Sequence, residues 1–217
     1  MALQFRLKDQ TIEESSAVDV VSSLASGDVL IVLSIVGATT TARTGGVPVH
    51  NATVNQDFTQ AGTTQAGTAE CSSELWYLFN PNLAGSTRFV APNSGLLTIR
   101  LIVSYYTGTG AEFDQVTQTG TSVQSPSLTL NNVPAGAAVV DVFGSGYKDV
   151  ATASDTLLYA NDEGAWTTHA QYQIQPTTGS QTFTWTNADS DDVAFIMASF
   201  KETGGLNLAL TGVSATG

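Results

Sequence analysis

The sequence predicts an all-β protein, an antiparallel two-sheet β-sandwich that is jelly-roll-like and has about ten short strands from two related halves. Three observations lead to this prediction. Apolar runs of strand length alternate with turns rich in Gly, Pro, Asn and Ser, and no convincing amphipathic helix exceeds a turn or two. Charged residues make up only 12% of the chain, and Thr, Ser, Asn and Gln supply most of the polarity. A weak internal repeat relates residues 75–105 to residues 170–200.

The repeat consists of matched residue types at a constant offset. The matched pairs are Tyr77 and Tyr172, Pro81 and Pro176, Thr87 and Thr182, Ser104 and Ser199, and the aromatic pair Tyr105 and Phe200. Each block also follows an apolar strand that opens with a glycine, at Gly27 and at Gly136. We interpret the two blocks as two strand sets that pack face to face in one core.

In the first half, the predicted strands stand between turn signals. Residues 1–14 mix charges of both signs with little periodicity, so we expect an N-terminal arm ahead of a single domain at 15–202. Residues 29–36 are apolar on both faces, as in a buried strand. Residues 38–67 are expected to form a long loop with one edge strand. Further strands are expected at 75–79, at 87–90 and at 97–104, the last with one buried and one solvent-exposed face.

The second half repeats this organisation. Residues 113–123 are expected to form a polar connection, and Asp141 is expected to face outward from the strand that contains Val140 and Val142. Strands are expected at 127–130, 138–142, 157–159, 172–175, 183–185 and 193–200. The C-terminal tail, 203–217, alternates apolar residues but has no nearby strand to pair with.

Charge and cysteine content limit the function classes. The formal net charge of −12 disfavours direct binding to nucleic acid and to an anionic membrane, because both need clustered basic residues. Cys71 is the only cysteine, so no intrachain disulfide can form, and we expect a core residue or a free thiol. The N-terminus lacks the apolar segment of a secretory signal, and the longest apolar run is far below the roughly 20 residues of a spanning helix. We therefore expect synthesis in the cytoplasm without a membrane anchor.

The sequence contains few residues suited to catalysis or cofactor binding. The common hydrolase, zinc-protease and phosphate-loop motifs are absent, so we predict no enzyme and no cofactor. His50 and His169 lie in different strand sets without metal-ligand spacing. Asp189, Asp191 and Asp192 are candidate calcium ligands, as is the cluster at 161–163, but such residues also form turns, which is the favoured interpretation.

Aromatic residues provide a second candidate site, a platform for stacking on sugars. The candidates are Trp76, Tyr77, Trp166 and Trp185. Aromatic side chains in a sandwich belong more often to the core, and we expect Phe183 and Trp185 to be buried on one shared face. Trp166 is the residue that we expect to be exposed and available for stacking on a ligand.

Several strand segments together resemble a known type of domain. The segments are GDVLIV from Gly27, LWY from Leu75, SLTL from Ser127, PAGAAVV from Pro134, QYQI from Gln171 and DVAFIMASFK from Asp192. They resemble jelly-roll-type β-sandwich domains of tailed-phage virion proteins and prophage-encoded surface proteins, over about residues 15–202. The resemblance implies a structural or recognition module and carries over no catalytic residue.

From this resemblance we expect a capsid decoration (cement) protein on the virion surface, made in the host cytoplasm. Its expected partners are the major capsid protein and other copies of itself, as a homotrimer. The parts outside the repeat are expected to bind them: Phe5, Arg6 and Leu7 of the arm, Arg43, Val47 and His50 of the loop, and Leu206, Leu208 and Leu210 of the tail. Two other classes stay open. These are a glycan-binding or adhesin module and a glycoside-active enzyme, which would need two carboxylates roughly 5 to 10 Å apart across a groove.

Overall fold

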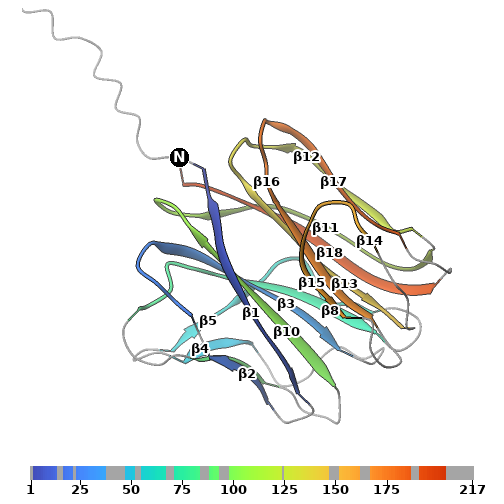
Figure 1. Ribbon diagram of the computed structural model, residues 1–217, viewed down its shortest axis with the longest axis horizontal. Coiled ribbons are helices and arrows are strands. Elements are labelled where there is room, and N and C mark those ends of the chain that lie inside the picture. Colours follow the sequence, from blue (N-terminus) through green and yellow to red (C-terminus); the bar gives the residue numbers. More distant parts are fainter. Residues whose placement is uncertain are drawn as a thin grey trace, which may run out of the picture.

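The computed structural model describes residues 2–13, 17–21, 23–37, 47–51, 55–66, 71–83, 88–92, 98–123, 125–146, 152–161, 167–186 and 191–203. All regular secondary structure in these ranges is β-strand, which confirms the predicted all-β sandwich class (Figure 1).

Of the described strands, ten belong to the first half of the chain and eight to the second. The first half contains β1 (Gln4–Glu13), β2 (Ala17–Val21), β3 (Asp28–Gly37), β4 (Val49–Asn51), β5 (Gln56–Asp57), β6 (Thr59–Gln60), β7 (Gln65–Ala66), β8 (Ser72–Phe79), β9 (Arg88–Pro92) and β10 (Ile99–Thr107). The second half contains β11 (Glu112–Val123), β12 (Ser127–Val133), β13 (Ala138–Ser145), β14 (Thr152–Ala153), β15 (Thr156–Asn161), β16 (Thr167–Ile174), β17 (Gly179–Thr186) and β18 (Asp191–Lys201).

Four antiparallel sheets form four layers. Sheet A has the order β1-β10-β3-β8-β6, with β7 also paired to β8, and sheet B has the order β2-β9-β4-β5. Sheet C has the order β11-β18-β13-β16-β15, and sheet D has the order β12-β17-β14. Three apolar clusters join neighbouring sheets in the sequence B, A, C, D. Figure 1 shows these layers from lower left to upper right.

Each half has the strand order of a jelly roll. In the first half the inner sheet holds strands β1, β10, β3 and β8, and the outer sheet holds β2, β9, β4 and β5. In the second half β11, β18, β13 and β16 occupy the same inner positions, and β12, β17 and β14 occupy the same outer ones. The two halves pack face to face through the cluster between sheets A and C, as expected, but this is not the single core that we expected, because each half also has a cluster of its own. Each half is a two-sheet sandwich of its own, and the two inner sheets pack together.

This double covering explains why the inner strands are apolar on both faces. Sheet A is covered by sheet B on one side and by sheet C on the other, so β3 and almost all of β10 are buried along their length. The exposed face predicted for 97–104 is wrong, because Arg100 and Ser104 are buried on the face of sheet A that is covered by sheet C. Arg100 reaches across the interface and donates from Nη1 to the hydroxyl of Thr168 and to the carbonyl of Asn161. Asp141, expected to face solvent, is likewise fully buried.

Two segments that the sequence analysis assigned to irregular structure are edge strands. Residues 4–13, predicted as part of an arm, form β1, which pairs with β10 along its whole length. Residues 112–123, predicted as a polar connection, form β11, which pairs with β18. Both strands are half exposed because they lie at sheet edges, so their sequences are more polar than those of the central strands.

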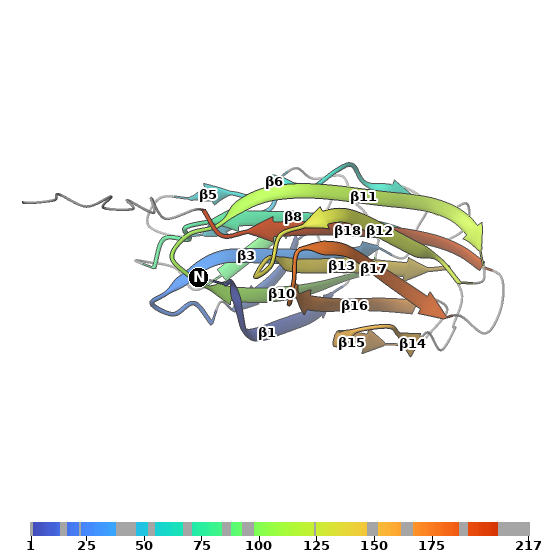
Figure 2. The same cartoon turned by 90° about the horizontal axis from the view of Figure 1, so that it is seen from above.

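The halves are related in space as well as in order. Phe5 lies opposite Tyr106 and precedes a β-bulge, and Phe113 lies opposite Phe200 and precedes an equivalent bulge. Phe5 stacks on Tyr172 at 4.3 Å between ring centroids, and Phe113 stacks on Tyr77 at 5.5 Å. Each stack therefore closes one margin of the interface between sheets A and C. In Figure 2 these margins lie on opposite sides, with β1 and β15 on one and β6 and β11 on the other.

The repeat seen in the sequence holds for one strand pair and is shifted by one residue in another. Tyr77 and Tyr172 are equivalent, since they lie opposite Val32 and Val140 in corresponding strand pairs. Phe200, however, corresponds to Tyr106 and not to Tyr105. Tyr105 packs between sheets A and B, whereas Phe200 packs between sheets A and C. A shift of one residue moves a side chain to the other face of its strand.

Candidate interaction surfaces

The outer face of sheet B has an apolar centre. Alternation along β2, β4 and β9 turns Val20, Phe89 and other residues inward, and the outward side of the sheet and its margin includes Arg88 and five apolar residues. We call the five apolar residues, Val21, Val47, Val49, Val90 and Pro92, the valine face. Cross-strand register joins them, because Val49 lies opposite Val90. Val21 is 60% exposed and Val47 is 41% exposed, so the described part of the chain leaves this face open to solvent.

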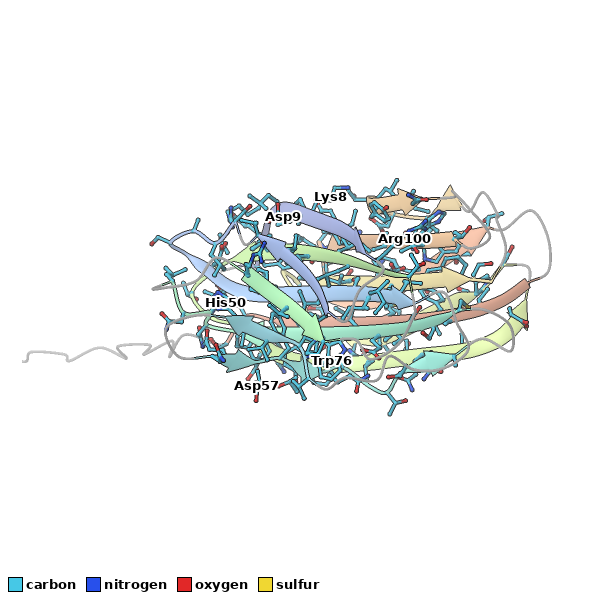
Figure 3. All side chains as sticks on the ribbon, turned by 90° about the horizontal axis from the view of Figure 1, so that it is seen from below. Lys8, Asp9, His50, Asp57, Trp76 and Arg100 are labelled. Carbon is cyan, nitrogen blue, oxygen red and sulfur yellow. The ribbon has the colours of Figure 1, made fainter. Side chains whose placement is uncertain are left out.

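Charged residues of both signs flank the valine face. Arg88, which is exposed, lies opposite Val21, and Asp57, also exposed, lies opposite Val49. Figure 3 shows Asp57 and His50 on neighbouring strands of sheet B. His50, predicted to contact a partner, is fully buried, and its ring packs on Phe89 at 5.0 Å between centroids. His50 thus supports the face from beneath and does not belong to it.

The outer face of sheet D occupies the equivalent position in the second half and has different chemistry. Its outward residues are Ser127, Thr129 and Asn131 on β12, and Ser180, Thr182, Thr184 and Thr186 on β17. Three cross-strand pairs bond through their side chains: Ser127 with Thr184 at 3.1 Å, Thr129 with Thr182 at 2.8 Å, and Ser180 with Asn131 at 3.1 Å. We call this the hydroxyl face.

The three arm residues predicted to bind a partner make contacts within the chain. Arg6 forms a bidentate ion pair with Asp28, with both N–O distances at 2.7 Å or below, and donates to the carbonyl of Ser23. Its guanidinium lies 5.0 Å from the ring centroid of Tyr105. The Tyr105 hydroxyl donates to Asp9 at 2.6 Å and accepts from the backbone of Ser23. These contacts fasten β1 and the segment after β2 to the central strands β3 and β10 of sheet A.

Phe5 and Leu7 are also used inside the fold. Phe5 packs into the cluster between sheets A and C, whereas Leu7 packs into the cluster between sheets A and B. Two residues at this spacing in a regular strand would share a face, so the bulge at Arg6 separates them. Of the described residues predicted to bind a partner, Val47 alone is exposed as expected.

Several predicted site residues lie outside the described ranges. They are Arg43, Leu206, Leu208 and Leu210 of the loop and tail, Trp166, and Asp189. Asp191 begins β18 and Asp192 is half-buried, but the described residues contain no group of His, Cys, Asp and Glu that could hold a metal ion. Trp185 and Phe183 are fully buried, as predicted, and Trp76 is buried as well. The described tryptophans therefore offer no platform for sugar stacking.

The chain has a shallow cavity of about 300 Å³ at the junction of the two halves, lined by Ala2, Gln4, Thr107, Gly108 and Thr109. None of these five residues has an ionisable side chain, and the nearby Glu202 accepts from the backbone N–H and the hydroxyl of Thr109. Across the described ranges, no helix is long and apolar enough to span a membrane.

Comparisons with known proteins found no relative. No family model matches the sequence, and neither the search of curated proteins nor the search of solved structures found a match.

Proposed function

We propose that this protein is a capsid decoration protein, which binds the outer surface of a virion shell and stabilises it by bridging neighbouring shell subunits. The observation that carries the proposal is the difference between the two outer faces. The same strand positions present valines on sheet B and hydroxyl groups on sheet D. A protein that lies on a shell needs one apolar face that binds the shell and one polar face that contacts water. Its role is binding and not catalysis.

The valine face is the part that we assign to the shell, with the hydroxyl face turned to solvent. An interface core is typically apolar, with charged groups confined to its rim. The valine face has an apolar pair at its centre, where Val49 lies opposite Val90, with the charged residues Arg88 and Asp57 beside it. The net charge of −12 favours a partner surface with basic groups around its apolar centre. The major capsid protein is the proposed partner.

Other copies of the chain are proposed partners too, as a trimer around a lattice threefold axis. Such a trimer would form through faces and loops and not by pairing strand edges. Three of the described edge strands, β1, β11 and β15, are each interrupted by a bulge, a feature that hinders edge-to-edge pairing.

The test is binding to particles of the virus that encodes the chain, measured by co-sedimentation. We expect saturable binding by the wild-type protein and a loss of at least tenfold in affinity for a variant with Val21→Lys and Val47→Lys. Because both residues are exposed, these changes leave the core intact. Leu157→Lys is the matched control, since Leu157 is a 49% exposed apolar residue on β15, outside the face.

Two results would refute the proposal. One is absence of the protein from purified particles together with no binding when it is added. The other is equal binding by the valine-face variant and the wild type. A protein truncated after residue 203 tests the tail separately: unchanged affinity would show that Leu206, Leu208 and Leu210 make no contact with the shell.

A further inference from the structure

A histidine lies in the core directly beneath the valine face. His50 of β4 follows the outward residue Val49, is fully buried, and packs its ring on Phe89 of β9 (Figure 3). Phe89 belongs to the apolar cluster between sheets A and B, where its ring lies 5.7 Å from that of Phe58 and 6.0 Å from that of Tyr105. The His50 ring therefore lies on the inner side of sheet B, among mainly apolar side chains.

Hydrogen bonds around Gln56 determine which ring nitrogen of His50 carries the proton. The Gln56 Oε1 atom accepts from the backbone N–H of Asn82 at 2.5 Å, and Gln56 Nε2 donates to the carbonyl of Asn80 at 3.4 Å. Both bonds fix the orientation of the Gln56 amide. His50 Nδ1 lies 3.4 Å from the same Oε1 atom, which can only accept, so Nδ1 carries the proton. Nε2 is then the unprotonated nitrogen of a neutral ring.

The surroundings of Nε2 suit a neutral ring and not a charged one. Nε2 is buried, and none of the described residues forms a hydrogen bond with it. A proton on this nitrogen would create an N–H group without an acceptor and would bury a positive charge, which costs far more than one unpaired acceptor. On sheet B, Asp57 and Arg88 are exposed and flank the valine face, so they belong to the outer side of the sheet.

The charged side chains of sheet A that contact the cluster or its margins have other partners. They pair as follows: Arg6 with Asp28, Asp9 with the Tyr105 hydroxyl, and Glu74 with the indole N–H of Trp76. Tyr105 itself stays neutral, because burial raises its pKa. The closed sheet B therefore holds His50 as a neutral ring.

We propose that His50 is a proton-sensitive lock beneath the valine face: the neutral ring holds β4 and β5 on sheet A, and protonation favours a state in which this part of sheet B has opened and the ring reaches water. The lock regulates the surface that we assign to the shell, and its last step, release from the shell, rests on the proposed function.

The direction of the pH effect follows from the geometry. An imidazole in water takes up a proton near pH 6.5, whereas the closed sheet gives a proton on Nε2 no acceptor. Opening therefore binds one proton below about pH 6.5. The stability that the neutral ring contributes is present above this pH and is lost as the pH falls.

Hydrogen exchange in the intact protein tests the lock without a shell. Peptides that cover β4, β5 and β9 are followed at pH 7.5 and pH 5, with rates corrected for the intrinsic pH dependence of exchange. We expect the opening constant of the wild type to rise about thirtyfold on acidification. That of His50→Phe should change little, because phenylalanine keeps the ring packing and takes up no proton.

The matched control for exchange is sheet D of the same molecules. Peptides that cover β12 and β17 should show the same pH dependence in both proteins, because titration elsewhere in the chain is common to them. An equal pH dependence of the β4, β5 and β9 peptides in wild type and His50→Phe would overturn the proposal.

A second measurement uses the wild type alone and does not depend on the folding of a variant. Nitrogen NMR of the imidazole ring reports which nitrogen carries the proton, and the comparison with His50→Phe serves only to assign the signals. We expect Nδ1 to be protonated and Nε2 to be unprotonated at pH 7.5. A proton on Nε2 at this pH would overturn the proposal, because that N–H group would then have an acceptor in the closed sheet.

Co-sedimentation with virus particles separates the lock from the proposed function. We expect the wild type to bind at pH 7.5 and to lose at least tenfold in affinity at pH 5, whereas His50→Phe keeps its affinity. Absence of binding at both pH values would overturn the proposed function but not the lock, which the exchange data test. Equal affinity of the wild type at the two pH values would overturn the step from opening to release.

Discussion

The closest approach of the two halves gives a sharp quantitative prediction. Gly144 of β13 faces sheet A, and a Cβ atom placed there would lie 2.8 Å from Val36 Cγ1 and 3.1 Å from Ser73 Oγ. Neither neighbour can move easily, because Val36 is fully buried and the Ser73 hydroxyl donates to the carbonyl of Ala194 at 2.9 Å. Gly144→Ala should therefore force sheets A and C apart locally and destabilise the protein.

The expected size follows from two opposing effects. Overpacking a closely packed core costs about 1 to 3 kcal/mol. Replacing glycine by alanine restricts the unfolded chain and returns about 0.4 to 1 kcal/mol. The net loss is about 1 to 2 kcal/mol, which lowers Tm by roughly 2 to 8 °C for a chain of this size. Urea denaturation should show a lower midpoint at an unchanged m value.

Gly179→Ala is the matched control, because a Cβ atom at Gly179 would meet nothing within 4 Å. It should leave stability unchanged or raise it slightly. The clash itself is tested by Val36→Ala, which removes the nearest atom: the double variant with Gly144→Ala should be more stable than the sum of the single effects by at least about 0.5 kcal/mol. If Gly144→Ala is as stable as Gly179→Ala, sheets A and C are not as close at this point as we describe.

Three further predictions concern the contacts that hold β1 and the interface margins, and urea denaturation tests each. Phe5→Ala and Phe113→Ala should each cost about 2 to 3 kcal/mol, less than for a fully buried Phe, and their effects should add because they act at opposite margins; strong coupling would contradict the two separate stacks. Tyr105→Phe should cost about 2 kcal/mol, because it removes the hydroxyl that bonds Asp9 and Ser23, and a neutral effect would show that water replaces those bonds. Arg6→Lys should cost about 1 kcal/mol, since lysine cannot form the bidentate pair with Asp28, and equal stability would mean that one ion pair suffices.

The sequence predicts the central strands well because their composition is unambiguous. The strands β3 and β18 are largely apolar on both faces, and burial on both sides is the physical reason. The edge strand β1 was missed because its apolar residues do not alternate. The bulge at Arg6 places Phe5 and Leu7 on opposite faces, and the charges of Arg6 and Asp9 are satisfied within the chain.

Asp141 and Arg100 show a second limit. Alternation along a strand tells which residues share a face, but it does not tell whether that face meets water or another sheet. A polar residue in such a pattern is normally assigned to solvent. Here the outer face of sheet C is covered by sheet D, and the inner face of sheet A by sheet C, so both charged residues are buried. Whether such a residue is exposed or buried depends on the number of sheets that pack in layers.

The pairing of the two halves resembles a symmetric dimer whose subunits are joined in one chain. In a true homodimer every substitution appears on both subunits, so equivalent surfaces cannot diverge. A covalent pair is free of this constraint: Leu33 and Asp141 differ at equivalent positions, as do the outer surfaces of sheets B and D, while the Phe–Tyr stacks at the margins are kept. Duplication within the chain thus lets the outer surface of each half change independently, while the contact surface between the two halves stays the same.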